Sequence, residues 1–98
     1  MKWVEILNLR SAGVPRESIE QEIPRSVAEV DRSNNLVAIR IYRHATLDTD
    51  LGVHLLFESP GPEMRPSALG QRLAAALKGF GLVSHSVWIQ QKETEQGE

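Results

Sequence analysis

Two histidines and two aspartates lie close together in the middle of the chain. His44, Asp48, Asp50 and His54 are spaced as His-x3-Asp-x-Asp-x3-His. Imidazole and carboxylate groups bind zinc or iron when their atoms converge on one point. This spacing matches no metal-binding motif, and it is typical of a polar strand end beside a solvated loop. We therefore expect neither a metal nor a cofactor here.

A second set of residues could carry out acid–base chemistry. His44, His54 and Glu58 can act as a general acid or base in a cavity, where burial would tune their proton affinity. Tyr42 and Trp88 would supply aromatic walls for a planar substrate. The alternative is that these side chains fill an interface between subunits, where aromatic residues are enriched. We favour interface packing over catalysis, and both hold if the interface encloses a pocket.

The third histidine, His85, has different neighbours. It alternates with Val83 and Val87, which places it on the apolar face of a strand, and Trp88 falls on the opposite face. A lone histidine on an apolar face is usually a hydrogen-bonded core group. We expect His85 to point toward the helices and to serve the core.

The elements that must position these residues follow from the spacing of the apolar side chains. The pattern predicts strands over residues 2–10, 36–46, 52–59 and 83–90, and helices over residues 15–30 and 67–80. The helical stripes are Ile19, Ile23, Val27 and Val30 in the first helix, and Leu69, Leu73, Leu77 and Phe80 in the second.

Four residues should shape the ends and the course of these helices. Pro15 fits the first helical position, and Pro24 predicts a kink or a division into two short helices. Ser67 is expected to cap the second helix, and Gly81 to end it in a left-handed conformation.

The order strand, helix, strand, strand, helix, strand predicts an α+β fold of the ferredoxin-like βαββαβ type. Its four-stranded antiparallel sheet would have the order 4-1-3-2, with both helices on one face. Residues 1–90 would form this single domain. Residues 91–98 contain no apolar side chain, and we expect them to form a disordered acidic tail.

The two middle strands should form a hairpin, and one register brings complementary side chains together. If residues whose numbers sum to 98 face each other, Arg40 lies opposite Glu58, Tyr42 opposite Leu56 and His44 opposite His54. Opposite charges and aromatic–aliphatic pairs are favourable across strands, at roughly 0.2–1 kcal/mol each.

The helices can cover only one face of this sheet. The other should present seven candidate ligand-binding or interface residues, namely Arg40, Tyr42, His44, His54, Leu56, Glu58 and Trp88. The first strand has Trp3, Leu7 and Leu9 on one side and Val4 and Ile6 on the other, so its orientation stays open. Because it is apolar on both sides, we expect the second face to be covered by another subunit, a ligand or a macromolecule.

The composition excludes several classes of protein. The 98 residues include 11 basic and 13 acidic side chains, for a net charge of −2, which argues against nucleic-acid binding. There is no cysteine, hence no disulfide and no thiol nucleophile. No apolar stretch is long enough to span a membrane, and none opens the chain as a signal segment. We expect a cytoplasmic protein that does not associate with membranes.

In the order and length of its elements over residues 2–90, the chain resembles the dimeric α+β barrel proteins. The most distinctive local segment runs from Ser67 to Trp88 and reads SALGQRLAAALKGFGLVSHSVW. These small ferredoxin-like domains include antibiotic-biosynthesis-type monooxygenases. The resemblance implies a homodimer in which two subunits pack their open sheet faces together. The monooxygenase members oxidise aromatic substrates without a metal or bound cofactor, but no catalytic motif of theirs can be matched to residues of this chain.

Three functions follow as hypotheses. The first is a self-associating domain that binds a small, partly aromatic ligand or a protein partner at its open sheet face. The second is a cofactor-independent monooxygenase or isomerase acting in a cavity between subunits. The third is an RNA-binding module that stacks bases on strand aromatics such as Tyr42 and Trp88.

Overall fold

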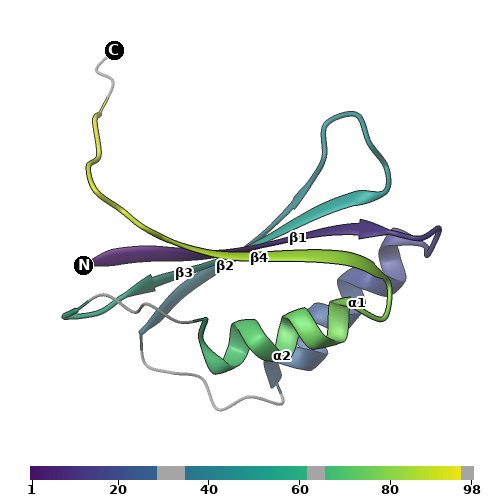
Figure 1. Cartoon of the computed structure of the whole chain (residues 1–98), viewed down its shortest axis with the longest axis horizontal. Coiled ribbons are helices and arrows are strands. Elements are labelled where there is room, and N and C mark those ends of the chain that lie inside the picture. Colours follow the sequence, from purple (N-terminus) through teal and green to yellow (C-terminus); the bar gives the residue numbers. More distant parts are fainter. Residues whose placement is uncertain (29–34, 62–65, 96–98) are drawn as a thin grey trace.

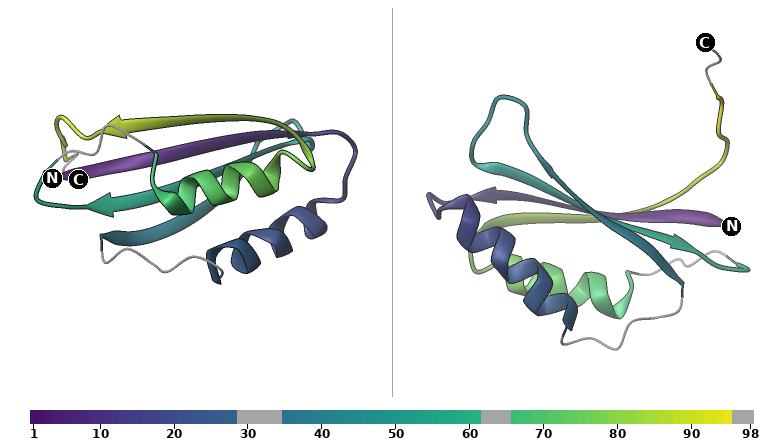
Figure 2. Two further views of the ribbon diagram at one scale, coloured as in Figure 1. Left: turned by 60° about the horizontal axis from the view of Figure 1, so that its bottom comes forward. Right: turned by 180° about the vertical axis from the view of Figure 1, so that it is seen from behind.

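A computed structural model describes residues 1–28, 35–61 and 66–95 of the chain. Its elements, in chain order, are β1 (Lys2–Ser11), α1 (Arg16–Ala28), β2 (Leu36–Arg43), β3 (Asp50–Glu58), α2 (Ala68–Leu77) and β4 (Gly81–Ile89). The strands form one antiparallel sheet in the order β2-β3-β1-β4, and both helices lie on the same face of it (Figures 1 and 2). This arrangement confirms the ferredoxin-like fold and, read in reverse, the expected strand order.

The hydrophobic core lies between the sheet and the helices. In β1 the side chains of Trp3, Leu7 and Leu9 are buried against the helices, whereas Val4 and Ile6 lie on the other face and are partly exposed. This settles the orientation of the first strand. The rest of the core comes from the expected helical stripes and from β3, namely Ile19, Ile23, Val27, Leu69, Leu73, Leu77, Leu51, Val53, Leu55 and Phe57.

The first helix is continuous through Pro24. A single α-helix runs from Arg16 to Ala28 with Pro24 inside it, so the expected division into two short helices is wrong. Ile19, Ile23 and Val27 form one buried stripe along this helix, and packing of that stripe outweighs the backbone hydrogen bond that proline cannot donate. Val30, the last residue of the expected stripe, lies outside the described residues.

The β2–β3 hairpin has a different register from the expected one. Arg40 lies opposite His54 and Tyr42 opposite Gly52, so the pairing is shifted by four residues from the expected one. An even shift keeps every side chain on its face. The expected strand began at residue 52 and left Leu51 in the loop, whereas β3 begins at Asp50 and places Leu51 in the core with Val53. A further shift between Leu36 and Ala38 introduces a bulge near the start of β2.

The two ends of α2 differ in how well the sequence predicts them. Ser67 is the N-cap, and its hydroxyl oxygen accepts a hydrogen bond from the Gly70 amide at 3.0 Å, as expected. Gly81, in contrast, does not end the helix in a left-handed conformation. It is the first residue of β4, paired with Ser11, and a side chain there would collide with the Arg10 carbonyl oxygen. Close approach of the two strands is therefore what requires glycine at this position.

The segment after β4 begins beside the first strand. The Gln90 amide donates to the Lys2 carbonyl at 2.9 Å, and residues 91–95 then continue without regular structure on the side of the sheet opposite the helices (Figure 1). Residues 96–98 of the expected tail lie outside the described residues. Neither helix of the described chain is long and apolar enough to cross a membrane.

Candidate functional site

The open sheet face is the surface that the helices leave uncovered. All seven side chains expected on this face contribute to it. Large apolar side chains are also exposed there, among them Tyr42, Leu82 and Trp88, whose exposed fractions are 46%, 77% and 60%. Exposed apolar surface on one face of a folded domain is typical of interaction sites.

The open face contains two hollows, which follow one another along the strands. The hairpin hollow, of about 710 Å³, lies near the β2–β3 loop and is lined by Tyr42, His44 and His54 together with Asn8, Gly52 and Ser84. The tail hollow, of about 610 Å³, lies toward the C-terminal segment and is lined by Arg40, His54, Leu56, Glu58 and Trp88, with Glu93 at its edge. His54 lines both hollows and is therefore central to the site.

His54 is the histidine best suited to proton transfer or ligand binding. Its ring lies against the ring of Tyr42, with centroids 4.6 Å apart and planes inclined by 50°. Burial and, to a lesser degree, the positive charge of Arg40 lower the pKa of His54. The imidazole is accordingly neutral near pH 7, with one nitrogen that donates a hydrogen bond and one that accepts.

His44 lies at the end of β2 and has a structural role in the hairpin loop. Its Nδ1 accepts hydrogen bonds from the backbone amides of Thr46 and Leu47, at 3.1 and 3.0 Å. Both bonds require the tautomer that carries its proton on Nε2. The register also separates His44 from His54, which lies opposite Arg40, so the expected pairing of the two histidines is wrong.

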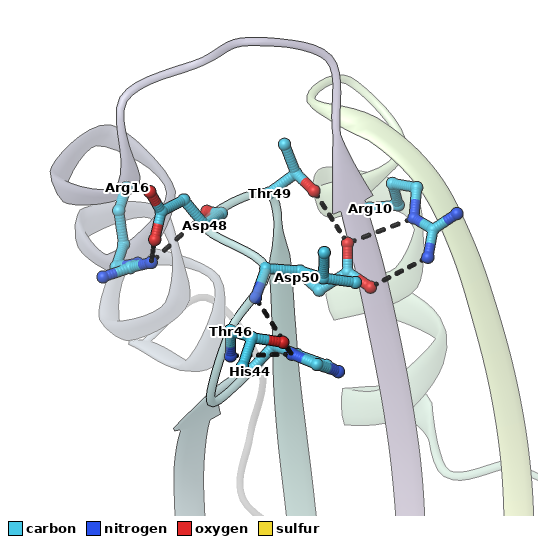
Figure 3. A network of polar contacts seen from close by, with 8 residues as sticks. Arg10, Arg16, His44, Thr46, Asp48, Thr49 and Asp50 are labelled. Carbon is cyan, nitrogen blue, oxygen red and sulfur yellow. Dashed lines mark hydrogen bonds and ion pairs between the residues drawn. The ribbon is translucent and has the colours of Figure 1, made fainter.

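The two aspartates of the possible metal cluster each bind an arginine (Figure 3). Asp50 accepts two hydrogen bonds from Arg10, both at 3.1 Å, and Asp48 lies 3.8 Å from the Arg16 guanidinium. The described residues contain no cluster of three or more histidine and acidic side chains arranged to hold a metal ion. Nothing in this geometry favours a metal site.

The Arg10–Asp50 pair joins β1 to β3 at the rim of the hairpin hollow. The hydrogen bonds from Arg10 and from the Thr49 hydroxyl hold the pKa of Asp50 below its usual range. Asp50 in turn raises the pKa of Arg10. Both groups therefore stay charged near pH 7 and fix the geometry of the strand ends beside the loop.

The motifs and periodicity of the sequence did not predict a buried acid–base pair, Glu5 and His85, on the helical side of the sheet. Glu5 is fully buried, and its carboxylate lies 2.9 Å from His85 Nε2 and accepts a hydrogen bond from the Ser67 amide at 2.6 Å. The expected inward orientation of His85 is confirmed. The signal for Glu5 was available, because it is the one acid in the otherwise apolar series of Trp3, Leu7 and Leu9.

The role of His44 can be tested by two substitutions. His44→Ala removes the acceptor for both loop amides, and we expect hydrogen exchange at Thr46 and Leu47 to accelerate about fivefold, as for a net hydrogen-bond contribution of about 1 kcal/mol. His44→Asn is the matched control, because an asparagine oxygen can occupy the position of Nδ1 and close the same turn. Equal exchange rates in wild type and His44→Ala would show that the ring does not hold the loop.

Comparison with known proteins identifies solved structures with the same architecture. A variant of SnoaB, a cofactor-independent oxygenase from Streptomyces nogalater, matches with a TM-score of 0.69 and 14% identity, over 97% of this chain and 98% of that one. Rv0793 from Mycobacterium tuberculosis matches with a TM-score of 0.67 and 13% identity, over 97% of this chain and 100% of that one. A candidate antibiotic biosynthesis monooxygenase from Bordetella bronchiseptica gives a TM-score of 0.68 and 13% identity, over 95% and 98%.

These matches confirm the resemblance noted from the sequence at the level of the fold. No family model matches the chain, and no curated protein is similar in sequence. At such identities the shared architecture does not transfer an activity from one chain to another.

Proposed function

We propose that this ferredoxin-like chain forms a homodimer through its open sheet face, and that each subunit binds a small ligand in a hollow enclosed by the dimer. The observation that carries the proposal is the uncovered sheet face itself. It combines exposed aromatic and aliphatic side chains with two hollows whose surface is more apolar than polar, although polar and charged side chains also line both. Ligand sites combine a mainly apolar surface with polar groups that fix orientation.

The exposed apolar side chains of this face are concentrated on the two edge strands. Val37 and Tyr42 belong to β2, and Leu82 and Trp88 belong to β4. A two-fold axis parallel to the strands would place β2 of one subunit over β4 of its partner, so that apolar side chains meet at both edges.

A cofactor-independent oxygenase is a second candidate function. It is favoured by the fold shared with SnoaB, together with a neutral histidine, His54, between the two hollows. An activity of this kind would appear as uptake of dissolved oxygen when the chain is mixed with oxidisable aromatic compounds. We expect His54→Gln to abolish that uptake in a chain that stays folded. Unchanged uptake in this variant would rule out His54 as the catalytic group.

Size-exclusion chromatography with light scattering tests the homodimer. We expect the wild type to elute with twice the mass of the chain, and Trp88→Lys to elute as a monomer. The reason is that a lysine at the interface must be desolvated without a partner, which weakens association by about a hundredfold or more. Trp88 is exposed in the single chain, so this variant should keep its fold.

Glu20→Lys is the matched control. It introduces the same side chain at an exposed position of α1, on the helical side of the molecule, and should remain dimeric. A wild type that stays monomeric at high protein concentration would refute the homodimer. A dimer broken by Glu20→Lys and not by Trp88→Lys would show that the helices, and not the open face, form the interface.

A further inference from the structure

We infer that the floor of the hairpin hollow, at Gly52, is an anchoring site for a planar, uncharged ring, whose hydroxyl or carbonyl oxygen is held between Asn8 and His54. This inference rests on the proposed ligand-binding function and assigns it to one hollow, one pair of anchoring residues and one chemical class of ligand. Neither Asn8 nor Gly52 is identified by the motif and periodicity arguments.

The position of Gly52 leaves an open space on the sheet. Gly52 lies in β3, opposite Asn8 of β1 and Tyr42 of β2, and it faces the open side of the sheet. A Cβ atom at this position would lie 3.4 Å from Asn8 Oδ1 and 3.9 Å from His54 Nε2. The two polar atoms therefore flank the same space, and the missing side chain leaves that space open to a ligand.

The polar side chains that flank this floor are available to a ligand. Within the described residues, the side chains of Asn8 and His54 form no hydrogen bond. Nearby polar groups of the rim are already paired, Arg10 with Asp50 and His44 with the loop amides. Asn8 and His54 are thus available to a ligand directly above Gly52, while Arg43 and Ser84 line other parts of the hollow.

The side chains around the floor indicate the chemical class of the ligand. The Tyr42 and His54 rings form an aromatic wall beside the floor, which suits a flat ring. The Asn8 amide and the neutral imidazole can each donate or accept, so either a hydroxyl or a carbonyl oxygen can be bound. Asp50 neutralises Arg10 at the rim, which favours an uncharged ligand over an anion. Arg43 also lines the hollow, so an anionic probe belongs in the test.

The experiment compares three probes of the same ring system, 1-naphthol, naphthalene and 1-naphthoate, titrated into the wild-type protein. Binding is followed by amide chemical shifts, which also locate the probe. We expect 1-naphthol to bind about tenfold more tightly than naphthalene, as for one or two net hydrogen bonds. We also expect it to bind more tightly than 1-naphthoate, with the largest shifts at Asn8, Gly52 and His54.

Two variants test the anchor. Asn8→Leu keeps the size of the side chain and removes its hydrogen bonds, so it should reduce the affinity for 1-naphthol several-fold and leave that for naphthalene unchanged. Gly52→Ala places a methyl group on the floor at ordinary contact distances, so the chain should fold while binding of both probes weakens. Gly61→Ala is the control, because a methyl group there meets no atom within 4 Å.

The outcomes separate this inference from the proposed function. The anchor is refuted if the three ring compounds bind the open face with equal affinity. It is also refuted if Asn8→Leu and Gly52→Ala bind 1-naphthol as tightly as the wild type does. In both cases the proposed ligand-binding function stands. If 1-naphthoate binds most tightly, and loses affinity with added salt, the ligand class is an anion and the inference is wrong. If no probe binds, the anchor for a planar ring is refuted, and the homodimer is judged separately by its mass in solution.

Discussion

Leu73→Asp is expected to abolish folding of the domain. Leu73 is fully buried in the middle of α2, between the helix and the sheet. Truncating a buried leucine costs about 2–5 kcal/mol, and an unpaired carboxylate in the core adds several more. This sum approaches the whole stability of a typical domain, about 5–15 kcal/mol. Far-ultraviolet circular dichroism and loss of the cooperative thermal transition would report the result.

Ala75→Asp provides the control for this substitution. It introduces the same acid two residues away, on the exposed face of the same helix, where the cost should stay below about 1 kcal/mol. A Leu73→Asp chain with a cooperative transition near that of Ala75→Asp would contradict the placement of the core. It would also remove the basis for the open face, because the two faces of the sheet are defined by the side that α2 covers.

The periodicity of the sequence alone predicts which side of each helix and strand is buried. Side chains separated by two in a strand, or by three and four in a helix, must share a face. The spacing of Leu69, Leu73 and Leu77 therefore predicts which side of α2 is buried, and the alternation in β3 predicts that His54 and Leu56 face away from it. Both predictions concern directions relative to the element itself, and the structure agrees with them.

What the sequence could not predict depends on register and on close approach between elements. Periodicity is unchanged when one strand slides by an even number of residues, so Arg40 opposite Glu58 and Arg40 opposite His54 were equally compatible with it. The hollow above Gly52 arises only in the observed register, which places Asn8 and Tyr42 on either side of it. Gly81 shows the same dependence, since only the neighbouring strand explains its missing side chain.

Glu5→Ala is expected to lower the free energy of unfolding by about 2–4 kcal/mol, which corresponds to a drop of roughly 10–25 °C in Tm for a chain of this size. The carboxylate of Glu5 is buried in the core and joins three elements. It accepts from the amide of Ser67, which precedes α2, and it pairs with His85 of β4. Without it the amide and the imidazole lose their partner, and a cavity is left beneath the helix.

A smaller loss is expected for Glu5→Gln, which keeps the shape of the side chain and one oxygen that accepts from Ser67. The comparison separates the contribution of packing from that of the charge. A Glu5→Ala chain that melts at the wild-type temperature would show that the carboxylate contributes nothing to attaching α2 to the sheet. Because Glu5 lies on the helical side, neither variant should alter the residues of the open face.

A substitution at Gly70 tests whether the Glu5 carboxylate occupies the space beside this glycine. A methyl group at Gly70 would collide with the Glu5 carboxylate, so Gly70→Ala should destabilise the wild type despite the higher helix propensity of alanine. In the Glu5→Ala background the carboxylate is gone, and the nearest remaining atom would be His85 Nε2, 3.0 Å from the methyl carbon, on a ring that has lost its partner and can move. Gly70→Ala should therefore cost about 1 kcal/mol less in that background than in the wild type. An equal cost of Gly70→Ala in both backgrounds would mean that the glycine accommodates something other than the buried carboxylate.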